Sequence, residues 1–229
     1  MPRLNMIEIR ESEVTYTNQR DWFFHPVGHH VRELLLHFIG KDFTLDGSSK
    51  FSAIFGELEE EDDPICSSIF GVTSFHIVDF DVEAFMKLPM NEQQEILLTE
   101  VTNALVAVAK KAGSDPNVIK NAAAEVRRND FAFEIPIKKL GRSTKNRKLK
   151  VEVMRCLGPE IGEVWEMRVL KKDGTVCGSE DITDRPDSLD RTDQFSKSSW
   201  DGNTFQIFNT RFKELEFSAD ITPYLEIIE

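Results

Sequence analysis

Residues 91–137 read NEQQEILLTEVTNALVAVAKKAGSDPNVIKNAAAEVRRNDFAFEIPI, and along them the spacing of the apolar residues changes. Up to Val126 the apolar residues recur every three or four positions, as they do on the buried face of a helix. From Phe131 they alternate with polar residues, which predicts a strand with one buried face. The stretch therefore predicts a pair of helices followed by a sheet.

The two helices also carry end signals. The first covers about 91–112 and stops at Gly113. It begins with a capping-box pattern, in which Asn91 and Gln94 would each cover a backbone N–H of the first turn. The second begins at Asp115-Pro116. A third helix is predicted over 26–39, and Asp81 is expected to cap a short one.

Strands are predicted on both sides of these helices. At the N-terminal side they cover 4–10, 51–55 and 65–80, the last with an interruption near Gly71 as an alternative. The last two are expected to form a β-hairpin across an acidic loop. At the C-terminal side an antiparallel β-meander is predicted, with an Asp173-Gly174 turn and strands at 131–137, 149–153, 165–169 and 175–177. Further strands are predicted at 204–208 and 212–219.

The order of strands, helices and strands predicts an α+β fold with N-terminal hairpin strands, central helices and a C-terminal antiparallel β-meander. A single α+β domain covering 1–229 is expected, and the alternative is a subdomain boundary near 130.

Charge and cysteine content narrow the classes of partner and compartment. The chain has 28 Lys and Arg against 40 Asp and Glu, a formal net charge of −12. This charge makes nucleic acid an unfavourable partner and suits a basic protein. The three cysteines form no CxxC pair, which argues against a disulfide framework and favours a cytoplasmic protein. No apolar stretch reaches about 18 residues, so no membrane partner is expected.

Two acidic segments are the candidate partner-binding surfaces. The denser one places six carboxylates within seven residues: Glu57, Glu59, Glu60, Glu61, Asp62 and Asp63. The looser one contributes Asp184, Asp187 and Asp190. Clustered carboxylates can steer a cationic protein, although they can also be a solvated loop that keeps a hairpin from aggregating. Trp200 is either an interface anchor or a side chain that closes one end of a core.

Other charged patterns point to rival functions. His25, His29, Glu33 and His37 are spaced by four, so they share one stripe of a helix and could converge on a metal ion. The stripe lies opposite Val31 and Leu34, which favours a solvent-exposed helix face. The segment Lys138–Lys150 is basic and could contact phosphates, but it contains no aromatic residue on which a base could stack.

No nucleophile elbow and no phosphate-binding glycine loop occurs in the chain. We therefore expect a non-catalytic, protein-binding inhibitor without a cofactor or metal. In character the chain resembles the immunity and antitoxin-like inhibitors, small acidic bacterial proteins that cover the basic site of a toxic enzyme such as a nuclease. The alternative is a metal-dependent hydrolase that uses the His25, His29, Glu33 and His37 stripe.

Overall fold

The computed structural model describes residues 1–13, 24–58, 64–184 and 188–226. Two compact units can be distinguished. Unit 1 comprises Met1–Phe133 with Leu157–Gly162, and unit 2 comprises Glu134–Cys156 with Glu163–Glu229. The chain combines helices with several sheets, and the strands of its C-terminal region are mostly antiparallel, which confirms the predicted α+β class. None of the described helices is both long enough and apolar enough to span a membrane.

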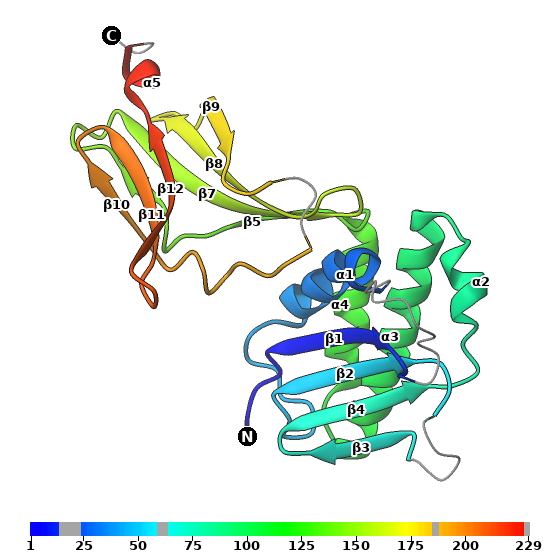
Figure 1. Cartoon of the computed structure of the whole chain (residues 1–229). Coiled ribbons are helices and arrows are strands. Elements are labelled where there is room, and N and C mark those ends of the chain that lie inside the picture. Colours follow the sequence, from blue (N-terminus) through cyan, green and yellow to red (C-terminus); the bar gives the residue numbers. More distant parts are fainter. Residues whose placement is uncertain (14–23, 59–63, 185–187, 227–229) are drawn as a thin grey trace. The chain divides into compact units, whose positions relative to one another are not determined.

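Unit 1 contains a four-stranded sheet with the order β1-β2-β4-β3 (Figure 1). Strands β1 (Met6–Glu11), β2 (Lys50–Phe55) and β4 (Val72–Ile77) are parallel. Strand β3 (Cys66–Ile69) is antiparallel to β4. A helix between β1 and β2 allows these two neighbours to run in the same direction.

The hairpin predicted between 51–55 and 65–80 is wrong. The chain turns back within the second segment, because Phe70 and Gly71 adopt positive φ angles of 51° and 80°. Two consecutive residues of this conformation make the tight turn that suits a hairpin. The hairpin is therefore β3–β4, and the reversal leaves β4 running parallel to β2.

The helices of unit 1 are α1 (Phe24–Ile39), α2 (Val82–Met86), α3 (Met90–Ala112) and α4 (Pro116–Arg128). In Figure 1, α1, α3 and α4 lie on one side of the sheet. Their buried side chains meet the buried side chains of β1 and β2 to form a core that includes Ile7, Phe51, Leu34, Leu97 and Ile119.

Most of the predicted helix ends are confirmed. Gly113 ends α3 with a φ of 79°, and the Asp81 and Asp115 side chains accept hydrogen bonds at the starts of α2 and α4. The predicted capping box is wrong, because α3 begins one residue earlier, after Pro89, and has no side-chain cap. Gln94 is instead buried, and its Oε1 lies 3.0 Å from Nε2 of His30.

Unit 2 is built around two sheets that share one core (Figure 1). The first has the order β5-β7-β8-β9, with strands β5 (Phe133–Pro136), β7 (Leu149–Gly158), β8 (Gly162–Lys171) and β9 (Val176–Asp181), and the short β6 (Arg142–Ser143) also pairs with β7. The second contains β10 (Lys197–Asp201), β11 (Thr204–Asn209) and β12 (Glu214–Asp220) and precedes helix α5 (Thr222–Glu226).

The predicted meander corresponds to the first of these sheets, with its turn at Asp173-Gly174. Strand β10 was not predicted, because its sequence, KSSWD, lies at the end of a polar stretch and shows no clear alternation. The core of unit 2 joins residues of both sheets, among them Val151, Trp165, Met167, Phe205 and Ile207.

Candidate functional site

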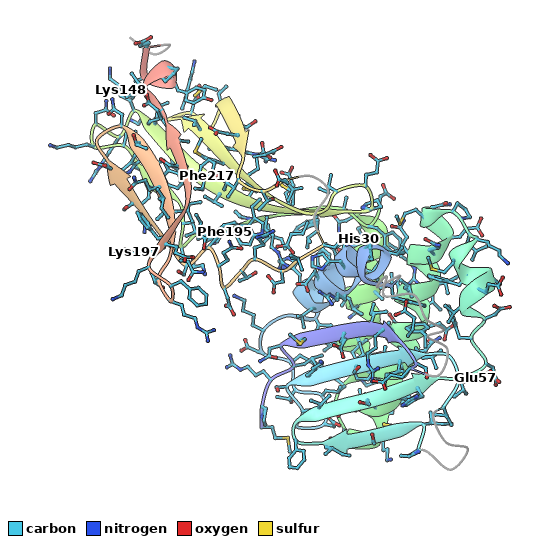
Figure 2. All side chains as sticks on the ribbon, viewed as in Figure 1. His30, Glu57, Lys148, Phe195, Lys197 and Phe217 are labelled. Carbon is cyan, nitrogen blue, oxygen red and sulfur yellow. The ribbon has the colours of Figure 1, made fainter. Side chains whose placement is uncertain are left out.

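The three parallel strands of unit 1 end at the same edge of the sheet. Glu11 is paired with Phe55, and Phe55 with Ile77, so β1, β2 and β4 end in register. Figure 1 shows their arrowheads pointing to this edge, and Figure 2 shows Glu57 there. Carboxylates lie at the end of each strand or within six residues after it. We call this set the acidic edge: Glu11, Glu13, Glu57, Asp79, Asp81 and Glu83.

An aromatic cluster packs next to the residues of the acidic edge. The Phe80 ring lies 4.8 Å from that of Phe55 and 5.3 Å from that of Phe85, measured between centroids. Phe24, at the start of α1, stacks on both Phe55 and Phe85 at 5.1 Å. These contacts hold the segment after β4 against the end of β2, so the carboxylates at both positions are carried by a packed core.

The carboxylates of the acidic edge differ in their surroundings. Glu11 is half-buried and accepts a hydrogen bond from the backbone N–H of Phe24 at 3.0 Å, and burial raises the pKa of its carboxyl group. The side chain of Asp81 caps α2, and Glu83 lies 2.9 Å from Nζ of Lys87. Glu57 and Asp79 are exposed to solvent. The edge therefore presents a group of negative charges, one of which, Glu83, is paired with Lys87.

The structure places only some of the predicted partner-binding residues. Glu57 lies on the acidic edge of unit 1. Glu59, Glu60, Glu61, Asp62, Asp63 and Asp187 lie outside the described residues. Asp184 and Asp190 belong to unit 2, as does Trp200. Asp190 lies 3.5 Å from the guanidinium of Arg155, so part of its charge is neutralised locally. The predicted set is thus divided between two units.

The histidine stripe of α1 does not form the solvent-exposed face that was predicted. His29 is fully buried, and its Nδ1 lies 3.0 Å from the guanidinium of Arg32. The reason is that α1 contacts β1, α3 and α4 at once, which leaves little of its surface open. Glu33 is 11 % exposed at the side chain and lies 3.4 Å from Arg32, while His37 is exposed. The side chain of His25 is outside the described residues.

A metal centre finds no support in this geometry. Among the residues that the structure describes, no three His, Cys, Asp or Glu side chains are grouped so that they could hold a metal ion. Of the stripe of α1, this statement covers His29, Glu33 and His37.

Sequence reasoning missed Glu11, Asp79, Asp81 and Glu83 as members of one surface. It paired the segments 51–55 and 65–80 in opposite directions, which would put their ends at opposite edges of the sheet. A signal was present, since each of the strands that prove to be parallel is followed by acidic residues. Comparison of the chain with protein-family models, with curated proteins and with solved structures returned no match.

Proposed function

We propose that the protein is a non-catalytic inhibitor of the immunity or antitoxin type, which covers the basic site of a partner protein in the bacterial cytoplasm. The acidic edge is the main contact surface in this proposal. The observation that carries it is the alignment of three parallel strand ends, which gathers carboxylates from positions 11 to 83 on one edge.

The charge of unit 1 supports this proposal. Unit 1 has 12 basic and 23 acidic residues, a formal net charge of −11, whereas unit 2 has 16 and 17, a net charge of −1. A strongly negative body with a cluster of exposed carboxylates attracts a cationic protein and speeds its association. A toxic nuclease, whose active site must be positively charged to hold a phosphate backbone, is a partner of this kind.

The remaining predicted residues extend the proposed surface. Glu59, Glu60, Glu61, Asp62 and Asp63 follow Glu57 directly in the chain, so they are included as its neighbours in sequence. Asp184, Asp187 and Asp190 form a second contact set in unit 2. We expect this set to contribute less, because Asp190 already has an ion-pair partner.

The proposal is tested by affinity purification of the tagged protein from its source cells. The test variant is Glu57→Gln with Asp79→Asn. Asparagine is chosen because Asp79 has a φ of 61°, a conformation that Asn tolerates well. The control is Asp42→Asn with Glu100→Gln, which makes the same change in net charge at positions outside the acidic edge.

We expect wild type and control to retain one basic polypeptide at near-stoichiometric yield, and the test variant to lose it. Retention of the same polypeptide by the test variant would count against the acidic edge as the contact. Absence of any basic polypeptide from the wild-type sample would count against the inhibitor function itself.

A further inference from the structure

Unit 2 contains an open pocket of about 670 Å³ at one end of its two sheets. The turn between β6 and β7, the turn between β10 and β11, and helix α5 surround it. Its apolar lining comes from Trp200, Ile221 and Leu225, and its polar rim includes Lys145, Asn146 and Asn203. This volume is typical of pockets that bind small molecules.

The indole of Trp200 is held in a fixed orientation beside the pocket. Its Nε1–H donates a hydrogen bond to the carbonyl oxygen of Ser143 at 3.0 Å. Its ring packs edge-to-face on the buried ring of Phe205, with centroids 5.5 Å apart. Trp200 remains only partly buried, so it offers an aromatic surface that does not have to be ordered when a flat ligand stacks on it.

The turn that forms the basic rim is also ordered in advance. The Thr144 hydroxyl lies 2.8 Å from Oδ1 of Asn146 and accepts a hydrogen bond from the backbone N–H of Leu149 at 3.2 Å. Oδ1 of Asn146 accepts a further bond from the N–H of Lys148 at 3.0 Å. Arg147 has a φ of 56°, a strained conformation that such a network can hold in place.

Three exposed cations belong to this turn. Lys145, Arg147 and Lys148 are exposed, and in the described part of the chain no carboxylate forms an ion pair with them. Two carboxylates are neighbours in the chain of residues that line the pocket. These are Asp201 and Asp220, and the latter accepts a hydrogen bond from the N–H of Thr222. Lys145 lines the pocket, and Arg147 and Lys148 follow it in the same turn.

We propose that this pocket binds a free nucleotide, with the base stacked on Trp200 and the phosphates against Lys145, Arg147 and Lys148. An aromatic surface beside a small group of cations matches a ligand that joins a flat ring to a compact anion. Because the pocket has the volume of a small-molecule site and the chain has a formal net charge of −12, which disfavours a long phosphate backbone, a free nucleotide fits better than a strand. The assignment is independent of the acidic edge in unit 1.

The segment Lys138–Lys150 contains no aromatic residue, but the fold places Trp200 beside it. Trp200 lies 57 positions along the chain from Ser143, the residue to which it is hydrogen-bonded. The segment on its own resembles a solvated turn. The fold brings the indole to Ser143 and to the pocket that Lys145 also lines.

Isothermal titration calorimetry on the full chain tests this inference with ATP, adenosine and inorganic tripolyphosphate as probes. The charge variant is Lys145→Gln with Lys148→Gln. Its control is Lys197→Gln with Lys213→Gln, which removes the same charge; Figure 2 shows Lys148 and Lys197 at opposite ends of unit 2. Trp200→Leu tests the stacking surface, and the unfolding temperature of each variant confirms that it is folded.

We expect wild type and control to bind ATP more tightly than either adenosine or tripolyphosphate. The charge variant should bind ATP at least fivefold more weakly and bind adenosine with unchanged affinity. Trp200→Leu should bind both ligands about tenfold more weakly. Absence of ATP binding by wild type, or equal binding by the charge variant and its control, would overturn the inference. Tighter binding of a single-stranded oligonucleotide than of ATP would overturn the assignment to a free nucleotide.

Discussion

His30 is the residue at which pH should act most directly on unit 1. It is fully buried between α1 and α3, and within the described residues its Nδ1 has no hydrogen-bond partner. Burial lowers the pKa of His30 to about 4, with the hydrogen bond to Gln94 opposing this shift. The imidazole is therefore neutral in the folded protein across the range in which the unfolded chain takes up a proton.

The sign of the resulting pH dependence follows from these two pKa values. Between about pH 6.5 and pH 4 the unfolded state binds more protons than the folded state, so the free energy of unfolding decreases as the pH falls. The contribution of His30 is fully present above pH 6.5, and up to about 3 kcal/mol is lost by pH 4. Denaturant unfolding at several pH values should show a smaller decrease for His30→Gln than for wild type. An identical decrease in the two proteins would contradict this role, and His37→Gln, at an exposed position, is the control.

Gly178 is a second position where a single residue affects local packing. A Cβ at this position would overlap the ring of Tyr224, which packs on the glycine and joins α5 to β9. Gly178→Ala should displace the tyrosine and lower the free energy of unfolding by about 1–3 kcal/mol. The same change in a Tyr224→Ala background should cost less than about 0.5 kcal/mol. Equal costs in both backgrounds would show that the ring is not the reason for the glycine.

Among the helices and strands, the start of α3 lacks the predicted local cap and has a tertiary contact instead. Asn91 is exposed and makes no capping bond, whereas Gln94 is buried against His30 and α1. Asn91→Ala should therefore leave the free energy of unfolding unchanged within about 0.5 kcal/mol. Gln94→Ala should lower it by about 1–3 kcal/mol, because a buried imidazole loses its hydrogen-bond partner. Chemical denaturation of both variants measures these changes. A large decrease in the free energy of unfolding for Asn91→Ala would support the predicted capping box.

Element identity could be predicted from the sequence better than strand direction. Helices α3 and α4 follow from their apolar faces and from Gly113 and Asp115, which act through neighbours in the chain. The direction of β4 could not be predicted, because alternation is the same in parallel and antiparallel strands. It depends on the turn at Phe70-Gly71, where a Phe adopts a left-handed conformation that its sequence does not indicate.

For the same reason, only part of the candidate site could be predicted from the sequence. Glu57 could be selected because it belongs to a run of acidic residues, whereas Asp79 stands in an apolar stretch and becomes notable only at the end of a parallel strand. The neighbourhood of Trp200 and Lys145 was hidden for a similar reason, since it depends on contacts between residues more than 50 positions apart.

At the scale of the whole molecule, the chain joins two units of different electrostatic character. Unit 1 has a net charge of −11 and exposes carboxylates at one edge of its sheet, while unit 2 is nearly neutral and has a basic turn beside an aromatic pocket. We propose protein recognition for unit 1 and small-molecule binding for unit 2. Changes at Glu57 and Asp79 should therefore leave ATP binding unchanged, which calorimetry on the double variant checks.

In the proposed function the acidic edge inhibits a basic protein, and a titration of that partner's activity measures this inhibition. The polypeptide captured from the source cells is purified, and its activity is measured as wild-type protein or the Glu57→Gln, Asp79→Asn variant is added. We predict loss of activity at one equivalent of wild type and at least a tenfold higher requirement for the variant, a difference of about 1.4 kcal/mol or more. Undiminished activity with bound wild-type protein, or equal inhibition by the variant, would contradict the claim.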